Sequence, residues 1–192
     1  MTYCRRLPLL LTIAMLPTVV GVDAGAQAAQ NTSGTAAAAL RAAGRDRGLC
    51  LVIGEADGEL TAALAKGSRM YVQGCTRNAR AVAAARGALV KAGVVARSSI
   101  VLREDRGLPY ADNLLNLVVS FNLGSTGLKV EEVLRVLAPC GVAVLGGAGN
   151  AEAALKKAGV QDVRSSGGLL VFTKPVDPDR LLETVAEGLG EK

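Results

Sequence analysis

A glycine turn offers the first chemistry in this sequence. The turn reads Gly54-Glu55-Ala56-Asp57-Gly58, and it lies between an apolar run over 49–53 and a helical pattern over 60–65. Glycine lets a ligand approach the backbone closely, and a helix N-terminus presents unpaired N–H groups and positive potential. The arrangement is that of a phosphate-binding loop, although an ordinary α/β turn has the same composition.

The residue types exclude several other chemistries. The chain contains no His, which removes the commonest general base, the Ser-His and Cys-His nucleophile pairs and His-containing zinc sites. The net charge is +5, but the 22 basic residues are scattered and no Lys/Arg run interleaves with aromatic residues. A solvated basic surface is favoured over nucleic-acid binding.

The elements that position the turn follow from the apolar pattern. Short β-type runs alternate with Ala-rich helical segments, which is typical of successive βαβ units and a mainly parallel sheet. Strands are expected over 49–53, 69–72, 99–102, 115–120 and 142–145, and helices over 60–65, 79–92, 130–137 and 151–157. A proline-glycine turn is expected at 139–141. Residues 162–163 and 169–173 should close the sheet as an antiparallel pair.

From Leu49 onward the chain resembles the class I S-adenosylmethionine-dependent methyltransferases. Besides the glycine turn, the resemblance is carried in family order by Leu108-Pro109-Tyr110, Asp112, the run 116–120 and the run 131–141. It implies a Rossmann-like methyltransferase fold over residues 49–174, a mainly parallel twisted sheet with helices on both faces and a terminal antiparallel strand pair. It also implies S-adenosylmethionine as cofactor and an unidentified small-molecule or protein methyl acceptor.

The resemblance assigns the cofactor site residue by residue. The turn would supply Gly54, Glu55, Ala56, Asp57 and Gly58; Thr76 stands where the family has the ribose-binding acid, Glu104 and Asp105 lie near the adenine, and Asn122 lies beside Phe121 at the cleft mouth. Three positions depart from the family, and the first is Val52, which stands where the family often has an acidic residue. Ala56 puts a methyl group where the middle glycine belongs, and the Thr76 hydroxyl cannot accept from both ribose hydroxyls as a carboxylate does. No residue is assigned as catalytic.

The N-terminus has the features of an export signal. Arg5-Arg6 precedes an apolar run of about 16 residues, and small residues at cleavage spacing follow it. The run is shorter than the roughly 20 residues that span a bilayer. We therefore expect residues 1–26 to be a signal peptide, 27–48 a linker with a short helix over 36–43, and 175–192 a tail. The mature protein would be periplasmic or extracellular, without a stable membrane span.

Export raises the question of disulfides. After cleavage only Cys50, Cys75 and Cys140 remain. Cys50 begins the first expected strand and Cys75 ends the second, a separation of roughly 13 Å along the strands. Because a bridge requires Cα atoms within about 7 Å, we expect three free thiols.

Three functions are compatible with these features. The first is an active methyltransferase. The second is an exported, non-catalytic methyltransferase-fold module with a degraded cofactor site, used for binding or scaffolding. A narrower resemblance, to methyltransferase-like domains that precede quinoprotein-type propellers in exported bacterial proteins, suggests a propeller-domain partner for it. The third, an NAD-type oxidoreductase, does not explain the run 131–141 or the closing strand pair.

Overall fold

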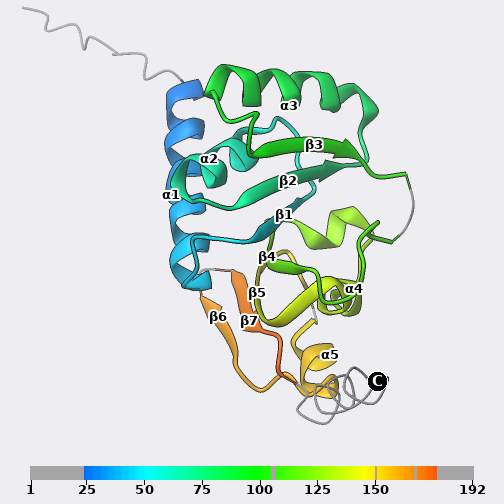
Figure 1. Ribbon diagram of the computed structural model, residues 1–192. Helices are drawn as coiled ribbons and strands as arrows, with labels where there is room; N and C mark the ends of the chain where they lie inside the picture. The colour runs from blue at the N-terminus through cyan, green and yellow to red at the C-terminus, as the bar shows by residue number, and fades with distance from the viewer. Residues whose placement is uncertain (1–23, 105–106, 150, 167, 177–192) are drawn as a thin grey trace, which may run out of the picture.

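The computed structural model describes residues 24–104, 107–149, 151–166 and 168–176 (Figure 1). Seven strands form one sheet in the order β3-β2-β1-β4-β5-β7-β6. The strands are β1 (Leu49–Ile53), β2 (Tyr71–Thr76), β3 (Ser98–Leu102), β4 (Leu115–Ser120), β5 (Leu137–Gly146), β6 (Val163–Ser166) and β7 (Leu169–Thr173). The first five run parallel, whereas β7 lies antiparallel to both β5 and β6. The mainly parallel sheet and its antiparallel closing pair are confirmed.

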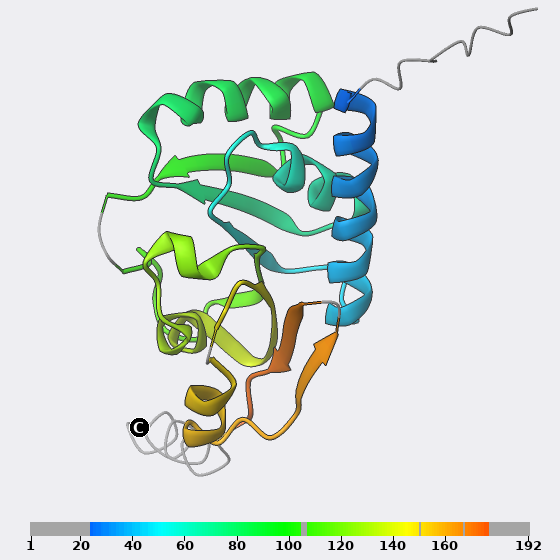
Figure 2. The same ribbon diagram turned by 180° about the vertical axis from the view of Figure 1, so that it is seen from behind.

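Helices cover both faces of this sheet (Figures 1 and 2). The helices are α1 (Ala24–Ala43), α2 (Glu59–Gly67), α3 (Ala79–Ala92), η1 (Leu123–Thr126), α4 (Val130–Val136) and α5 (Ala151–Lys157). One buried cluster joins the sheet to α1, α2 and α3, and the other joins it to η1, α4 and α5. Successive side chains of β1 enter the two clusters alternately, because strand side chains point to opposite faces. Leu51 lies in the second cluster and Val52 in the first.

The largest difference from the sequence prediction is α1. A short helix over 36–43 inside a linker is expected, but the helix spans Ala24–Ala43 and contacts α2 and β5. Ala36, Ala39 and Ala43 are buried against the sheet at helical spacing. Gly44, with φ of +59°, ends the helix by donating its N–H to the carbonyls of the last turn. The described part of segment 27–48 therefore contributes to the core.

The segment 137–141 also differs from the prediction. A turn is expected at Pro139-Cys140-Gly141, but these residues lie within β5, which begins at Leu137. The register against β4 shifts between Leu115 and Leu117, and Cys140 has φ of +60°. The Cys140 N–H donates to Lys174 O, and the Lys174 N–H donates to Gly141 O. Partners from β4 and from the end of β7 thus hold an irregular strand where local sequence favours a turn.

The second strand is also displaced from its predicted range. Apolar residues suggest 69–72, whereas β2 spans Tyr71–Thr76 and pairs with β1 on one side and β3 on the other. Gln73 and Gly74 interrupt the apolar pattern, so the sequence does not show that the strand continues to Thr76. Glycine is required at position 74, because a Cβ there would lie 2.5 Å from Thr61 Oγ1. Thr76 is consequently the last residue of β2, at the sheet edge where the resemblance puts it.

The motif residues outside the glycine turn form a structural cluster. Arg135 of α4 donates hydrogen bonds to Leu108 O (3.0 Å), Tyr110 O (2.8 Å) and Asp112 Oδ1 (2.7 Å). It also binds both carboxylate oxygens of Glu132, and these bonds hold the pKa of Glu132 below its ordinary value. These hydrogen bonds hold the connection between β3 and β4 against α4. These family-like residues therefore maintain the fold around the site.

The described cysteines are free thiols. Cys50 and Cys75 are buried, and Cys140 is exposed. The register pairs Cys50 with Val72 and Cys75 with Ile53, and the two thiols belong to different core clusters. Their side chains therefore lie on opposite faces of the sheet as well as at opposite ends of the strands.

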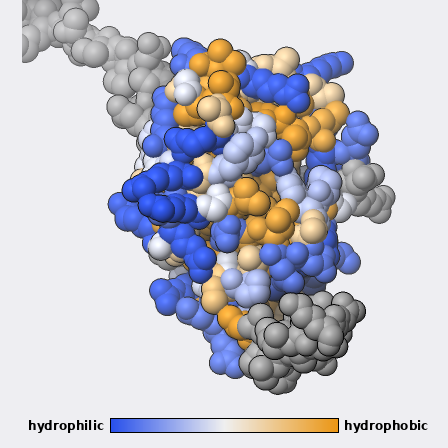
Figure 3. Space-filling view, viewed as in Figure 1, coloured by the Kyte–Doolittle hydropathy of each residue, from blue (hydrophilic) through white to orange (hydrophobic). Residues whose placement is uncertain are grey.

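The surface seen in Figure 3 is mixed, with apolar and charged side chains close together. The exposed large apolar residues include Val90 of α3, Leu102 of β3, and Val95, which lies between these two elements. In the described part of the chain, no helix is long and apolar enough to cross a membrane.

Candidate functional site

The candidate site lies at the carboxyl ends of the parallel strands. β1 pairs with β2 on one side and with β4 on the other, so the strand order reverses there. Open α/β sheets bind ligands at such a reversal, outside the carboxyl ends of the strands. A cavity of about 180 Å³ occupies this place. Its wall includes Gly54, Thr76, Arg77, Asn78, Arg103 and Thr126.

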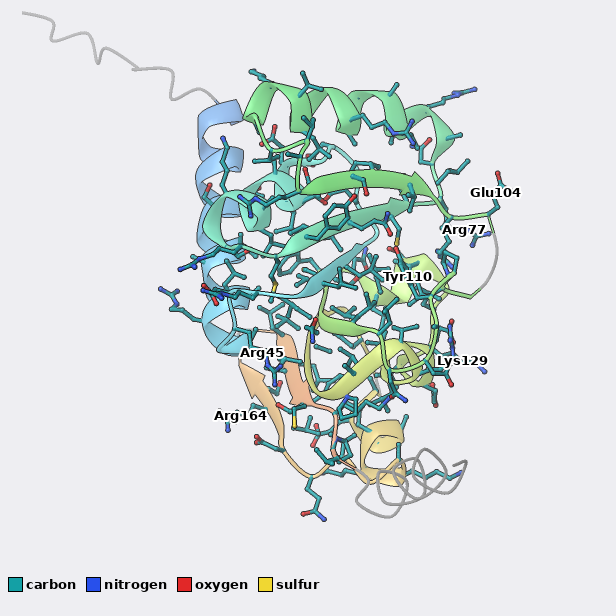
Figure 4. All side chains as sticks on the ribbon, viewed as in Figure 1. Arg45, Arg77, Glu104, Tyr110, Lys129 and Arg164 are labelled. Atoms are coloured by element: carbon teal, nitrogen blue, oxygen red, sulfur yellow. The ribbon has the colours of Figure 1, made fainter. Side chains whose placement is uncertain are left out.

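A larger cavity of about 270 Å³ lies at the opposite edge, between the end of α1 and β5–β7. Its wall includes Arg45, Cys140 and Arg164, and Asp162 pairs with Arg164 at 3.1 Å. Figure 4 shows Arg45 and Arg164 far from Arg77 and Glu104. Because ligand sites of open α/β sheets lie at the carboxyl edge, the smaller cavity is the candidate.

Glycine is needed at positions 54 and 58 for different structural reasons. Gly54 and Gly58 both have positive φ, +81° and +83°, which side chains rarely adopt. A Cβ on Gly58 would lie 2.4 Å from Ala85 O, so this glycine allows α2 to begin against α3. Gly54 faces the cavity, where a Cβ would lie 3.1 Å from Thr126 Cγ2. Of the two glycines, only Gly54 lines the candidate cavity.

Glu55 points into the protein instead of toward the cavity. It is 5% exposed, and its Oε1 accepts from Gly58 N at 3.1 Å. Its Oε2 accepts from Thr61 N at 3.0 Å and from Thr61 Oγ1 at 2.5 Å. Burial raises the pKa of this carboxyl, an effect that outweighs the hydrogen bonds. Glu55 therefore satisfies the first N–H groups of α2, the groups that a ligand at a glycine turn would use.

Ala56 and Asp57 face solvent at the outer side of the turn. Asp57 Oδ1 accepts from Glu59 N at 3.0 Å, which helps to begin α2. Asp57 also lines a second cavity of about 240 Å³ with Leu60, Phe121 and residues of α1. The glycine turn thus separates two cavities, one toward β2 and β3 and one toward α1 and the end of β4.

Thr76, which the family resemblance assigns to the ribose, is buried, and its hydroxyl already has a partner. The Asn78 N–H donates to Thr76 Oγ1 at 3.2 Å, and Asn78 Oδ1 accepts from Arg80 N at 3.1 Å. These two bonds form the turn that begins α3. A hydroxyl engaged in this way is a weaker acceptor for ribose than a free carboxylate.

The cavity wall also contains two arginines that the family resemblance does not predict, Arg77 and Arg103. Arg103 is 4% exposed; its N–H donates to Thr76 O at 2.7 Å and its Nη2 to Thr126 O at 2.6 Å. Arg77 is exposed at the mouth. Each arginine follows the last residue of a strand, a signal that the sequence contained. Cys75 adds no charge, because burial raises the pKa of its thiol to about 11.

The remaining predicted residues that the structure describes do not line this cavity. Glu104 is exposed, one residue beyond Arg103, and Asp105 lies outside the described residues. Asn122 is exposed, and its carbonyl accepts from the Ser125 hydroxyl at 2.9 Å. Of the predicted cofactor residues, the cavity therefore brings together Gly54 and Thr76. Across the described part of the chain, no cluster of acidic or Cys side chains could hold a metal ion.

Comparison with known proteins identifies the fold. No protein-family model and no curated protein matches the chain. A candidate S-adenosyl-L-methionine-dependent methyltransferase from Methanococcus maripaludis is structurally similar, with a TM-score of 0.62 and 18% identity over 79% of this chain and 94% of that one. A SAM-dependent methyltransferase from Aquifex aeolicus gives 0.57 and 16% over 72% and 87%. These identities establish the methyltransferase fold alone.

Two further similar structures are larger than this chain. The [4+2]-cyclase SpnF has a TM-score of 0.53 at 22% identity over 62% of this chain, which spans 44% of the cyclase. A geranyl diphosphate methyltransferase in complex with SAM has a TM-score of 0.51 at 16% identity over 59% of this chain, which spans 48% of that enzyme. The chain thus spans about half the length of these two proteins.

Proposed function

We propose that this protein is a methyltransferase-like binding module that keeps the fold and its ligand-binding edge but does not transfer methyl groups from S-adenosylmethionine. The observation that carries the proposal is the wall of the carboxyl-edge cavity. Arg77 and Arg103 lie there beside Thr76, at the place where the family holds its cofactor's ribose with an acid. A neutral threonine thus stands in place of the acid, and two positive side chains lie beside it.

Charge opposes the methyl donor at this wall. S-adenosylmethionine carries a sulfonium and an ammonium against one carboxylate, so its net charge is positive. Like charges near a partly buried site repel by more than they do in bulk water. Arg77 carries a positive charge at the mouth of the cavity, and Arg103 lies in the same wall. The cavity therefore disfavours a cationic ligand.

The hydrogen-bonding groups support the same proposal. Thr76 Oγ1 accepts from Asn78 N, and the Glu55 carboxylate accepts from Gly58 and Thr61. Each group that the family resemblance assigns to the cofactor at these positions bonds within the protein. The fold itself does not require methyl transfer, since the similar structures include a [4+2]-cyclase.

An active methyltransferase is the second candidate. It is supported by the similar structure that holds SAM and by the second cavity beside Asp57 and Phe121, on the β4 side of the glycine turn. Transfer to a good nucleophile requires chiefly positioning, so the lack of a general base does not exclude it. The acceptor would be an unidentified small molecule or protein.

Calorimetric titration separates the two candidates. The binding module is expected to show no saturable binding of S-adenosylmethionine or S-adenosylhomocysteine up to about 1 mM, equivalent to less than about 4 kcal/mol of binding free energy. A dissociation constant below about 10 μM for either compound, with a folded protein by circular dichroism, would contradict the proposal and favour the active enzyme.

We also propose that the protein is exported. Residues 1–23 lie outside the described residues, and cleavage between Ala26 and Ala29 would fall near the start of α1. The buried helix residues Ala36, Ala39 and Ala43 come later, so cleavage leaves the core contacts of α1 intact. N-terminal sequencing of the protein from its host should give a start at Gln27 to Ala29. A start at Met1 would refute export by cleavage. A propeller-domain partner stays a prediction.

A further inference from the structure

We propose that the outward side of helix α3 is a contact surface for a membrane that contains anionic phospholipid. This inference goes beyond the proposed function, because the surface lies apart from the carboxyl-edge cavity. The evidence is the exposure, the charge and the position of the residues that form the α3 face, namely Arg80, Ala84, Gly87, Val90, Lys91 and Val95.

The inner and outer sides of α3 differ in exposure. Ala85 and Leu89 are buried on the inner side, whereas the helix positions of the α3 face are exposed. Val90 is 67% exposed, and Val95, in the connection from α3 to β3, is 54% exposed. A Cβ on Gly87 would meet nothing within 4 Å, so this position is open to an approaching surface. Between its charged residues the α3 face is therefore flat and apolar, and Figure 3 shows apolar side chains over this helix.

The charge of the α3 face is positive. No Asp or Glu occurs between Glu59, which begins α2, and Glu104, which follows β3. This stretch includes α3 itself and the elements that pack on it, α2, β2 and β3. Arg80 and Lys91 are exposed, and neither side chain forms an ion pair with a described residue. Their charges are therefore available to an anionic surface.

The start of α1 lies beside this surface. Figures 1 and 2 both place the first turn of α1 next to the end of α3, and the last turn of α3 contains Val90 and Lys91. The helix α1 begins at Ala24, and Asp23 alone separates it from the apolar run over 7–22. An export signal places such a run in the membrane during translocation, so the end of α3 is then close to the lipid surface. This step rests on the proposed export.

The combination of exposed aliphatic and basic side chains favours a lipid surface over a nucleic acid. Aliphatic side chains enter the boundary between head groups and acyl chains, while Lys and Arg extend their charges to the phosphates. Each basic side chain near an anionic leaflet strengthens the attraction. Proteins that bind single-stranded nucleic acids combine basic residues with aromatic side chains that stack on bases, and the α3 face contains no aromatic residue.

Sedimentation with vesicles tests the surface, using the protein as it is isolated from its host. Vesicles of phosphatidylcholine with about one-third phosphatidylglycerol are expected to bind it at least about tenfold more tightly than vesicles of phosphatidylcholine alone. Binding to the anionic vesicles should weaken as NaCl is raised from about 0.1 M to about 0.5 M, because salt screens exposed charges. Equal affinity for the two kinds of vesicle would overturn the proposal.

Paired variants separate the α3 face from the general charge of the protein. Arg80→Gln with Lys91→Gln is expected to weaken binding to the anionic vesicles at least about tenfold. The control, Arg41→Gln with Lys157→Gln, removes the same charge from exposed positions in the last turns of α1 and α5 and should leave binding unchanged. Equal losses in the two pairs would overturn the site.

A third pair tests the apolar part of the α3 face. Val90→Ser with Val95→Ser is expected to weaken vesicle binding at least about threefold, because less apolar surface enters the lipid. Both side chains are exposed, so the variant should fold like the wild type. Duplex DNA is the competing ligand. Unchanged vesicle binding in the valine pair, with DNA binding that is lost in the Arg80 and Lys91 pair, would assign the surface to nucleic acid and overturn the lipid proposal.

Hydrogen exchange locates the contact on the protein. Anionic vesicles are expected to slow amide exchange in residues 79–97 and to leave it unchanged in residues 130–157, which include α4 and α5. Slowing confined to residues 1–23 would mean that the N-terminal segment alone binds lipid, and it would overturn the α3 face. N-terminal sequencing reports on export separately, so a failure of the export proposal and a failure of this surface are distinguishable.

Discussion

Replacing Ala56 by glycine and Thr76 by aspartate together is expected to tighten S-adenosylhomocysteine binding about ten- to a hundredfold. An aspartate at 76 supplies a charged acceptor for the ribose hydroxyls, and a charge-assisted hydrogen bond contributes about 1.5–3 kcal/mol. It can still accept from Asn78 N, as Thr76 Oγ1 does now at 3.2 Å, so α3 should begin unchanged. The added charge also offsets Arg77 and Arg103.

The single variants show which position causes the gain. Ala56 is exposed on the turn and does not line the cavity, whereas Thr76 does. We therefore expect Thr76→Asp alone to give most of the effect and Ala56→Gly alone to give little. Titration with NAD is the ligand control and should not show the gain. Unchanged S-adenosylhomocysteine affinity in a folded double variant would mean that these positions do not line a cofactor site.

Replacing Glu55 by alanine is expected to lower the free energy of unfolding by about 2–4 kcal/mol. The change removes three accepted hydrogen bonds, and it strands the hydroxyl of Thr61, which is 0% exposed. An unsatisfied buried donor costs about 1–3 kcal/mol, and loss of a helix cap about 1 kcal/mol. Urea unfolding measures the effect. Asp57→Ala is the matched control, because its single bond to Glu59 N is exposed.

The same carboxyl should make stability depend on pH. Burial raises its pKa above the ordinary value of 4.5, so the folded state holds the proton more tightly than the unfolded chain. Its contribution is greatest below pH 4.5 and is lost as the pH rises through the folded-state pKa. The Glu55→Gln side chain does not titrate. The free energy of unfolding of the wild type should therefore fall relative to that of this variant as the pH rises from about 4.5 through the folded-state pKa. A stability difference that stays constant with pH would contradict the raised pKa.

The local pattern of apolar and capping residues was enough to predict the elements that surround the site. The predicted ranges 49–53, 79–92 and 115–120 agree with β1, α3 and β4. β1 and β4 are nearly continuous apolar runs, as expected for strands covered on both faces. α3 begins after Asn78, which caps it, and ends at Gly93 in the left-handed conformation. These signals lie within a few residues of the elements that they define.

Contacts distant in sequence decided the segments that were predicted wrongly. α1 is long because its alanines pack on the sheet and on α2, and the Ala-rich sequence alone gives no sign of that surface. β5 includes Pro139-Cys140-Gly141 because Lys174, more than thirty residues later, pairs with its backbone. Neither partner is visible in a local window.

The sequence by itself determined the class of fold, the glycine turn and the order of the motifs, because helix and strand periodicity and turn residues act over a few neighbouring positions. Only the tertiary structure decided the direction of each side chain at the site. It turned Glu55 inward, because the buried N–H groups of α2 and Thr61 need an acceptor. It placed Arg77 and Arg103 on one cavity wall, because the register of β2 against β3 brings together residues that are distant in the chain.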